Sequence, residues 1–293
     1  MKNVRTDFER HDDWKPVIRA ENLKVSLKNR HKQADLVKGV SFEVYPGECL
    51  GILGESGSGK SMSVKAMLGI LDRNFIVSGN AWFEDKNLMR EDKESLRLIR
   101  GSKIAVVLQN PMTCFDPLYR IGNQMAETFA THTDWNKEEI HRRSIEVLER
   151  MQIRNPEEVL AKYPHQLSGG MLQRIMIGIA MALKPALLIA DEPTTAIDAI
   201  TQREILEEFI RIKKEHRTAM IFITHDLGAI SKVADRLVVM NKGEIVDRGD
   251  FQHILHHASD AYTRLLVEKR AAVMKKYRES IHHQEYVQEV FHD

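Results

Sequence analysis

A glycine-rich octapeptide, Gly54–Ser61, limits the fold of this chain more than any other feature of its 293 residues. It reads Gly-Glu-Ser-Gly-Ser-Gly-Lys-Ser and matches the pattern G-x-x-x-x-G-K-[ST]. The preceding residues, Cys49–Leu53, form a short apolar run bounded by glycine, which is typical of a buried parallel strand. A helix over about Lys60–Leu71 is expected to follow. A strand, a glycine-rich loop and a helix in this order predict an α/β domain with a parallel sheet.

The octapeptide has the residue types that bind nucleotide phosphates. Its glycines allow backbone N–H groups to approach an anion without a clashing Cβ atom, and the start of the next helix favours negative charge. Lys60 would supply a positive charge to the β- and γ-phosphates, and the Ser61 hydroxyl is a hard ligand suited to Mg²⁺. A flexible turn that contains a lysine by chance is the alternative, which the flanking strand and helix disfavour. The candidate ATP-binding residues here are Gly54, Glu55, Ser56, Gly57, Ser58, Gly59, Lys60 and Ser61.

A second apolar run, Ala186–Ala190, ends in two carboxylates, Asp191 and Glu192. Acidic side chains at the end of a buried strand are costly unless they have partners. Asp191 fits a residue that holds the Mg²⁺ shell, and Glu192 fits a general base that polarises an attacking water. The alternative is that both acids only cap the turn at Pro193. The glycine-rich octapeptide elsewhere in the chain favours the catalytic interpretation.

Three apolar runs each lead into a polar residue. Ligands of open α/β sheets bind beyond the carboxyl ends of the strands, so these polar side chains are expected to converge on one edge of a sheet. The runs are Lys103–Leu108, Ala186–Ala190 and Ala219–Thr224, and the polar residues that follow them are Gln109, Asp191 and His225.

Between Gln109 and Leu167 the pattern changes to that of helices. Glu138–Met151 has apolar residues at helical spacing, and Asn155-Pro156 is typical of a helix start. We therefore expect a helical insert within the α/β domain. The other expected elements are strands over Pro16–Leu27 and Val40–Val44, a turn at Tyr45–Glu48, a helix near Ala199–Glu215, a strand pair around Arg236–Asp247 and a charged helical tail.

A second octapeptide, Leu167–Arg174, narrows the choice of family. It reads Leu-Ser-Gly-Gly-Met-Leu-Gln-Arg, and its Ser168, Gly169 and Gly170 precede a predicted helix over Met171–Leu183. Such a helix start is a second anion-binding position, separate from Gly54–Ser61. The octapeptide resembles the LSGGQ signature of ATP-binding cassette (ABC) proteins. The alternative is a Ser-Gly-Gly turn that only caps its own helix.

The resemblance to ABC proteins covers roughly Pro16–Leu266 and implies roles for several residues. Gln109 would belong to the Q-loop, which senses Mg²⁺ and couples to a transmembrane partner, and His225 would be the switch histidine that contacts the γ-phosphate. Thr195–Asp198 resembles the D-loop. In the family, the signature contacts ATP that is bound by the other subunit of a head-to-tail dimer. The resemblance implies Glu192, His225 and Gln109 as catalytic residues, Ser168, Gly169 and Gly170 as further nucleotide contacts, and Ser61, Gln109 and Asp191 as Mg²⁺ ligands.

The same resemblance implies a P-loop NTPase (RecA-like) α/β core with an antiparallel β subdomain and an inserted α-helical subdomain. The expected divisions are a flexible N-terminal segment at 1–15, an ATP-binding domain at 16–250 with its helical subdomain at about 110–180, and a helical C-terminal extension at 251–293. Two features depart from the family pattern. Residues 24–30 have no aromatic side chain to stack on adenine, so Leu27 or Arg30 would substitute for it. Met171 replaces the usual glutamine of the signature.

Two stretches resemble the importer ATPases for dipeptides, oligopeptides and nickel. Gln109–Leu118 is similar to their QNP-x-x-x-[FL]-[ND]-P stretch, and Ala261–Leu266 to their H-P-Y-T-[RK]-x-L-L element, with Ala261 in place of proline. Many peptide importers carry a cysteine cluster after this element, whereas this chain has no cysteine beyond Cys114. The combination is most similar to the D-type ATPase subunit of nickel importers. It implies uptake of nickel or another metal complex, with dipeptide or oligopeptide import as the alternative.

Composition bears on the partners and the compartment. A formal net charge of +1 creates no global field for nucleic acid. Cys49 and Cys114, both in apolar surroundings, are too few for a disulfide framework. The sequence has no run of roughly 18 apolar residues that would span a membrane. The implied partners are a second, homologous ATPase in a heterodimer, two transmembrane permease subunits and an extracytoplasmic substrate-binding protein, with this chain peripheral at the cytoplasmic face of the membrane.

Two other interpretations are considered. A soluble ABC protein of DNA repair or translation would usually carry two cassettes or a long coiled-coil insert, and many exporters fuse membrane spans to the cassette.

The histidine-rich tail suggests a metal site, because His253 and His257 have the spacing of one helical face, although a solvated tail explains it as well. The histidines of the tail are His253, His256, His257, His282, His283 and His292.

Overall fold

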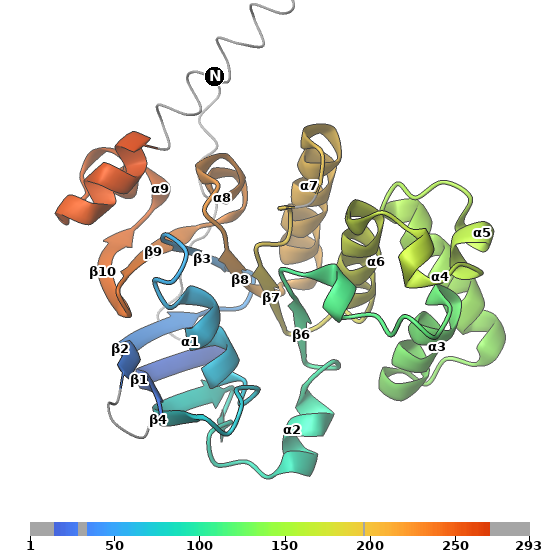
Figure 1. Ribbon diagram of the computed structural model, residues 1–293, viewed down its shortest axis with the longest axis horizontal. Helices are drawn as coiled ribbons and strands as arrows, with labels where there is room; N and C mark the ends of the chain where they lie inside the picture. The colour runs from blue at the N-terminus through green and yellow to red at the C-terminus, as the bar shows by residue number, and fades with distance from the viewer. Residues whose placement is uncertain (1–14, 29–33, 196, 270–293) are drawn as a thin grey trace, which may run out of the picture.

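The computed structural model describes residues 15–28, 34–195 and 197–269, which form two sheets and a group of helices (Figure 1). The larger sheet has six strands in the order β10-β9-β3-β8-β7-β6. All of its neighbours pair in parallel except β9 and β10, which are antiparallel. The carboxyl ends of five strands therefore meet at one edge. The strands are β3 (Cys49–Leu53), β6 (Ile104–Val107), β7 (Leu187–Asp191), β8 (Ala219–Ile223), β9 (Arg236–Asn241) and β10 (Glu244–Gly249).

The three central strands β3, β7 and β8 are apolar because this sheet is covered on both faces. Every one of their residues is buried, the pattern expected of parallel strands between layers of helices. Two helices, α7 (Ala199–His216) and α8 (Leu227–Val233), contribute buried residues to the core on one side. The helix α1 (Lys60–Met67) contributes to the core on the other side. The strand ends are thus held in a rigid layer.

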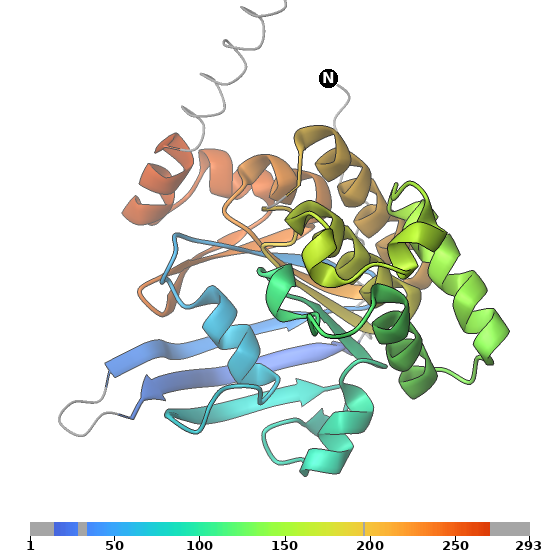
Figure 2. The same cartoon turned by 45° about the vertical axis from the view of Figure 1, so that its right-hand side comes forward.

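The smaller sheet is antiparallel and has the order β2-β1-β4-β5. The helix α1 contacts β1, β2 and β4, and its buried side chains share one core with Ile18 of β1 and Ile52 of β3. Figure 2 shows α1 lying over this sheet. The first helix of the chain therefore ties the two sheets together. The strands are β1 (Ile18–Leu27), β2 (Ala34–Val44), β4 (Phe75–Phe83) and β5 (Lys86–Asn87), and β5 is followed by α2 (Lys93–Ile99).

A group of helices is inserted between β6 and β7, as expected, and lies beside the larger sheet (Figure 1). The helix α6 packs on α4, and a Cβ atom at Gly178 would lie 2.7 Å from Val147 Cγ1. Glycine thus permits the close approach of these two helices. The group consists of the 3-10 helix η1 (Pro111–Thr113), α3 (Ile121–His132), α4 (Lys137–Arg150), α5 (Pro156–Leu160), the 3-10 helix η2 (Pro164–Gln166) and α6 (Gly169–Ala182).

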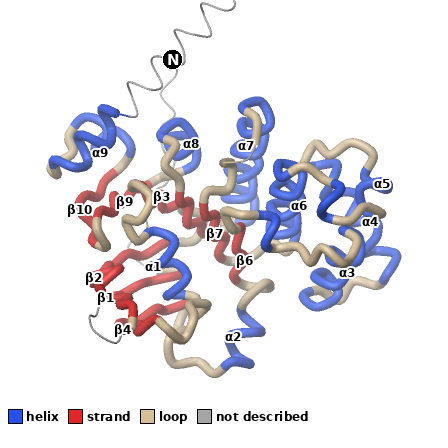
Figure 3. The backbone as a smooth tube through the Cα atoms, in the orientation of Figure 1, coloured by secondary structure: helices blue, strands red, loops and turns tan. Residues whose placement is uncertain are grey.

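The C-terminal part of the described chain returns to the sheet. After β10 come α9 (Phe251–His256) and a helical stretch at 261–269, and α9 lies next to β10 (Figure 3). Leu266 and Val267 of that stretch are buried in the core that also holds α7 and α8. In the described ranges, none of the helices is long and apolar enough to cross a membrane.

Several expectations need correction. The helix after the glycine-rich loop ends at Met67 and not near Leu71, because the chain turns at Gly69, where φ is +63°. The strand expected at Val40–Val44 begins at Ala34. Cys49 is buried as expected and burial raises the pKa of its thiol, but Cys114 is exposed in the loop after η1. Asn155 precedes α5 as expected, yet its side chain does not cap the helix.

Candidate functional site

A cavity of about 530 Å³ lies over the carboxyl end of β3. It brings together the glycine-rich loop and polar residues that follow three other strands. Gln109 and His225 were expected at this edge, whereas Asp191, the third residue expected there, is the last residue of β7 and does not line the cavity. Gln109 follows β6, Glu192 follows β7 and His225 follows β8. The residues that line it are Leu36, Glu55, Ser56, Gly57, Gly59, Lys60, Ser61, Met62, Gln109, Glu192 and His225.

The glycines of the loop are required by its backbone path. Gly54, Gly57 and Gly59 all have positive φ, at 159°, 80° and 104°. A Cβ atom at Gly54 would lie 2.4 Å from the carbonyl oxygen of Met240, and one at Gly59 would lie 3.0 Å from that of Leu36. The loop therefore packs tightly on the β9–β10 turn and on β2. Gly57 differs, because a Cβ atom there would meet no atom within 4 Å.

Lys60, which begins α1, is folded back onto its own loop. Its Nζ donates hydrogen bonds to the carbonyl oxygens of Gly54 at 2.9 Å and Glu55 at 3.0 Å. The ammonium group is thus held at the cavity wall. The Ser58 hydroxyl is buried in the same loop and has no hydrogen-bond partner among the described residues, but Ser58 does not line the cavity.

Ser61 and Asp191 connect the loop to the end of β7. Ser61 Oγ donates a hydrogen bond of 2.8 Å to Asp191 Oδ1. Burial raises the pKa of the Asp191 carboxyl above its usual range, the hydrogen bond from Ser61 lowers it in part, and the nearby Glu192 raises it further. Two hard oxygen atoms of the chain therefore lie side by side next to the cavity.

Glu192 is held in one orientation by residues of its own loop after β7 and of the loop after β8. Its backbone is in the left-handed region, with φ of 50°, and its N–H donates to the carbonyl oxygen of Ile223 at 2.8 Å. Its Oε1 lies 2.8 Å from His225 Nδ1, and its Oε2 accepts hydrogen bonds from Thr195 and Thr224, each at 3.4 Å. The carboxylate and the imidazole thus form a pair at the cavity wall. The strained backbone agrees with a functional position.

The residues at this cavity fit a nucleoside triphosphate with a divalent cation. The helix α1 has no side chain capping its N-terminus, and such a helix start favours an anion. Lys60 lines the same cavity. Ser61 and Asp191 are the hard oxygen ligands that Mg²⁺ prefers, with phosphate oxygens and waters completing its shell. Among the described residues, no group of three or more His, Cys, Asp or Glu forms a metal site made by the protein alone.

The second predicted anion-binding position lies outside this cavity. Ser168 precedes α6, and its Oγ accepts a hydrogen bond of 3.2 Å from the N–H of Met171. Ser168 is exposed and Gly169 and Gly170 are partly exposed, and none of the three lines the cavity. Their predicted contact with nucleotide therefore needs ATP held elsewhere.

The apolar side chains that line the cavity are Leu36 of β2 and Met62 of α1, and no Phe, Tyr or Trp among the described residues lines it. Leu27, one of the two substitutes suggested for the adenine-stacking residue, does not line it. The other substitute, Arg30, lies outside the described residues.

Sequence reasoning missed two polar contacts of this region. Gln173 of α6 is fully buried and donates to the carbonyl oxygen of Pro193 at 2.9 Å and, more weakly, of Leu108 at 3.5 Å. It therefore links the residues next to Gln109 and Glu192. The hydroxyl of Tyr262 accepts a hydrogen bond from the N–H of Glu55. A polar residue inside the apolar helix α6 was a usable signal for Gln173. The resemblance of Ala261–Leu266 to an importer element includes Tyr262, but it did not indicate a contact with the loop.

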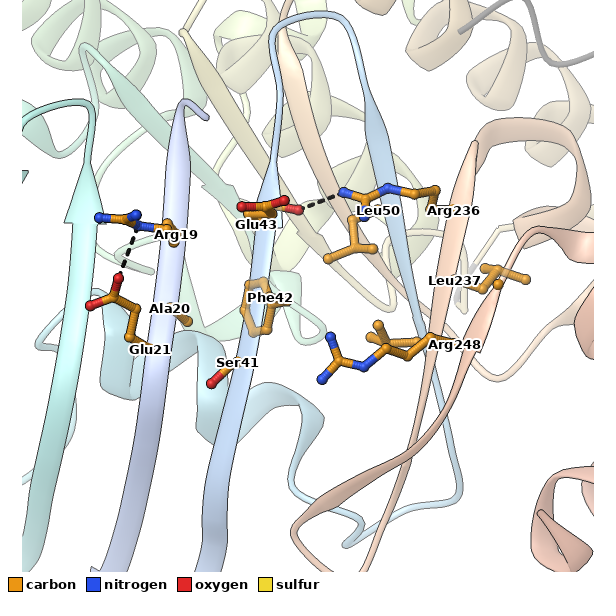
Figure 4. A pocket seen from close by; sticks show the side chains of 12 residues that line it. Arg19, Ala20, Glu21, Ser41, Phe42, Glu43, Leu50, Arg236, Leu237 and Arg248 are labelled. Atoms are coloured by element: carbon orange, nitrogen blue, oxygen red, sulfur yellow. Dashed lines mark hydrogen bonds and ion pairs between the residues drawn. The ribbon is translucent and has the colours of Figure 1, made fainter. Parts of the chain in front are cut away.

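A second cavity, of about 290 Å³, lies between the two sheets (Figure 4). Its wall includes Phe42 and Leu50, and Arg236 at its edge donates to the carbonyl oxygen of Glu43 at 2.9 Å and pairs with Glu48. The ion pair joins β9 to the turn before β3, and the hydrogen bond to Glu43 joins β9 to β2. None of the predicted site residues lines this cavity, so we regard it as structural.

The histidines of the tail lie partly outside the described residues, which end at 269. The ring centroids of His253 and His257 are 6.5 Å apart, and His253 Nε2 lies 3.7 Å from Asp247 Oδ1. Among residues 15–28, 34–195 and 197–269, no group of three or more His, Cys, Asp or Glu could hold a metal ion. His282, His283 and His292 lie outside these ranges.

Comparisons with known proteins agree with this geometry. The ABC transporter family matches residues 37–195. The chain is 43% identical over 243 residues to the metal-staphylopine import system ATP-binding protein CntD of Staphylococcus aureus, which covers 83% of this chain and 90% of that protein. It is 37% identical to the glutathione import ATP-binding protein GsiA of Escherichia coli over 86% of this chain, but this spans only 41% of GsiA.

A solved structure has the same fold. The ATP-binding cassette MJ0796, as a dimer bound to ADP and phosphate after hydrolysis, aligns with a TM-score of 0.73 and 24% identity, over 80% of this chain and 98% of that chain. This match supports the P-loop NTPase fold and nothing finer. Taken with the family match and the relatives, it leads to one conclusion: the chain belongs to the ABC transporter family, as an ATP-binding and ATP-hydrolysing subunit.

Proposed function

We propose that this chain hydrolyses Mg²⁺-ATP at the Gly54–Ser61 loop to drive an importer, with a metal complex as cargo. One observation carries the chemical part of the proposal. Ser61 and Asp191 are hydrogen-bonded at 2.8 Å beside a cavity whose wall also holds the Glu192–His225 pair. Groups that would hold a cation, orient phosphates and accept a proton are thus gathered in one place.

In the proposed mechanism, each residue acts from the position that it has in this structure. Backbone N–H groups of the loop and Lys60 would bind the phosphates, and Ser61, Asp191 and Gln109 would hold Mg²⁺, which neutralises charge on the β- and γ-phosphates when bound. Glu192 would accept the proton of the attacking water. His225 would keep that carboxylate in place through Nδ1 and contact the γ-phosphate. The threonines at 3.4 Å restrict the second carboxylate oxygen.

A second cassette is part of the proposal. Ser168, Gly169 and Gly170 lie at a helix N-terminus outside the chain's own cavity. We propose that they complete the ATP site of a homologous partner ATPase in a heterodimer, while the partner's equivalent residues complete this one. Asp198, which caps α7, and its exposed neighbour Ile200 would lie close to that interface.

The proposed permease partners would bind beside the inserted helices. A cavity of about 560 Å³ lies between β6, α3 and α6, with Phe115 and Tyr119 in its wall. Met112, Leu118 and Tyr119 are large apolar side chains exposed around it, and Leu118 is 78% exposed. Exposed apolar side chains gathered around a hollow are typical of protein docking sites. They follow Gln109 directly, so a docked permease would contact the loop that reaches the nucleotide.

The cargo is inferred from the relatives. CntD serves the import of a metal–staphylopine complex and GsiA the import of glutathione. The higher identity to CntD, and the lack of cysteines after Cys114, favour a metal complex such as nickel over a peptide. The proposed complex has two permease subunits and an extracytoplasmic binding protein, and the ATPase pair lies at the cytoplasmic face of the membrane.

The test is affinity purification of the tagged chain from detergent-solubilised membranes. We expect two integral membrane subunits and a second cassette to copurify, and the binding protein loaded with a nickel complex to stimulate ATP hydrolysis by the complex. The matched control is Lys60→Ala, which should assemble equally but bind ATP roughly 100-fold more weakly, since it loses a charged phosphate contact. Stimulation by dipeptides or glutathione instead of metal would reassign the cargo, and recovery of the chain without membrane subunits would contradict the transporter proposal.

A further inference from the structure

The helical stretch at 261–269 reaches the phosphate-binding loop. The backbone N–H of Glu55 donates a hydrogen bond of 2.9 Å to the hydroxyl oxygen of Tyr262. The two residues are 207 positions apart in the sequence. A residue from the end of the described chain is therefore bound to the loop that would hold the triphosphate.

Tyr262 is fixed in place by its neighbours. Asp260 Oδ1 accepts hydrogen bonds from the N–H groups of Tyr262 at 2.9 Å and Thr263 at 3.2 Å. These two hydrogen bonds cap the start of the helical stretch. The buried Asp247 of β10 accepts from the N–H of Ser259 at 3.0 Å. Leu266, only 3% exposed, packs the far end of the stretch into the core. The tyrosine is thus presented by an anchored segment.

Both backbone polar groups of Glu55 are hydrogen-bonded. Its N–H donates to the Tyr262 hydroxyl, and its carbonyl oxygen accepts from Lys60 Nζ at 3.0 Å and from the N–H of Ser58 at 3.2 Å. The Tyr262 hydroxyl is therefore one residue away from the contact that positions the Lys60 ammonium. No comparably direct link joins the other C-terminal side chains described above to the loop.

The Tyr262 hydroxyl contacts the loop outside the nucleotide cavity. Glu55 and Lys60 line this cavity, whereas Tyr262 does not. The β9–β10 turn also supports the loop, because the N–H of Gly243 donates to the Ser58 carbonyl at 2.9 Å. ATP would therefore enter without displacing the tyrosine, and the contact would persist in the bound state.

We propose that Tyr262 is a positioning residue for ATP binding: its hydroxyl holds the Glu55 peptide and so preorganises the first half of the phosphate-binding loop. This rests on the proposed nucleotide site at Gly54–Ser61. Preorganisation raises affinity because less loop ordering is required when the ligand binds. The helical stretch at 261–269 thus contributes to ATP binding through Tyr262.

A second contact of the same segment is much weaker. Lys269 Nζ lies 3.9 Å from Glu55 Oε1, and both side chains are more than half exposed, at 61% and 52%. Exposed ion pairs of this kind contribute little. The proposal therefore assigns the effect to the tyrosine hydroxyl, and Lys269→Gln should change ATP affinity by less than about twofold.

The test is Tyr262→Phe in the full chain, which removes the hydroxyl and keeps the ring. We expect affinity for Mg²⁺-ATP, measured by calorimetry, to fall roughly two- to tenfold, the effect of one lost hydrogen bond. The hydrolysis rate at saturating ATP should stay within about twofold, because Glu192 and His225 are untouched. Hydrogen exchange at the Glu55 amide should become faster, while the segment 263–269 keeps its protection.

The matched control is Tyr163→Phe, a tyrosine of the inserted helical region, which should leave ATP affinity and exchange at Glu55 unchanged. Unchanged affinity in Tyr262→Phe would overturn the proposal, whatever the exchange rate. Loss of protection over 263–269 together with weaker binding would also overturn it, because the tyrosine would then only hold the segment. If the wild-type chain bound no ATP, or if Lys60→Ala bound it normally, the nucleotide site itself would be wrong.

Discussion

Two helices of this chain begin after a serine- and glycine-rich stretch, and their N-termini are built differently. The first turn of α1 follows Gly54–Gly59 and has no side-chain cap. The first turn of α6 is capped by the Ser168 hydroxyl. The α1 terminus faces a cavity with Lys60 and Glu192 at its wall, whereas the α6 terminus lies outside that cavity with Ser168 exposed.

The α1 terminus therefore belongs to a nearly complete binding site, whereas the α6 terminus supplies half of one. At α1, a helix start without a side-chain cap and the Lys60 ammonium lie at the cavity. At α6 the described chain offers only a helix start and a serine that already has an internal partner. The α6 terminus would contact ATP if a second chain held the nucleotide against it. The predictions below separate the functions of the two termini.

The largest effect should come from the base at the complete site. Glu192→Gln keeps the size of the side chain but removes the proton acceptor, so hydrolysis should fall about 100- to 10,000-fold. Mg²⁺-ATP affinity should change little, because the phosphate contacts remain. Phosphate release and calorimetry measure the two quantities separately. The exposed Glu207→Gln on α7 is the control and should hydrolyse ATP normally, and near-normal turnover in Glu192→Gln would remove Glu192 as the base.

A smaller effect should appear in the stability of the empty protein. The pKa of Asp191 is raised in the folded state, so its ionised form destabilises the fold at neutral pH. This penalty shrinks as the pH falls through the raised pKa and is lost below the usual pKa of an aspartate. Asp191→Asn should therefore raise the melting temperature at pH 7, by about 2–4 °C for each kcal/mol gained. The gain should shrink as the pH is lowered toward the usual range of an aspartate.

Asp191→Asn also removes the carboxylate that would hold Mg²⁺. Hydrolysis should then no longer depend on Mg²⁺ bound by this side chain, and Mg²⁺ should no longer raise the melting temperature in the presence of ATP. Calorimetric scans with and without Mg²⁺-ATP measure both effects. Asp85→Asn, at an exposed position, is the control. A lower melting temperature in Asp191→Asn without nucleotide would contradict the assigned direction of the pKa shift.

Much of the phosphate site was predictable because it is local. Cys49–Leu53 is a strand with the predicted bounds, since a strand buried on both faces is a continuous apolar run between turn residues. Glu192 and His225 were predicted from their places after such strands, and they meet at 2.8 Å. Strand ends on one edge of a parallel sheet converge whatever the distance between them in the sequence.

The parts that were not predicted depend on surfaces and long-range contacts. Strand β4 has exposed and buried residues in an irregular order, so its sequence lacks the pattern of a strand. The apolar lining by Leu36 arises because β2 begins earlier than its apolar residues indicate. The bond from Glu55 to Tyr262 joins segments whose separate sequences contain no sign of the other.

The decisive experiment is sedimentation of a cassette pair, made of this chain carrying Glu192→Gln and the second cassette that copurifies with it. With Mg²⁺-ATP the pair should associate into a stable two-cassette species, and without nucleotide it should dissociate. Adding Ser168→Arg should abolish this association, although the chain still binds ATP in its own cavity, while Ser231→Arg on α8 should not. Equal association with Ser168→Arg would mean that the α6 terminus does not act on the partner's nucleotide.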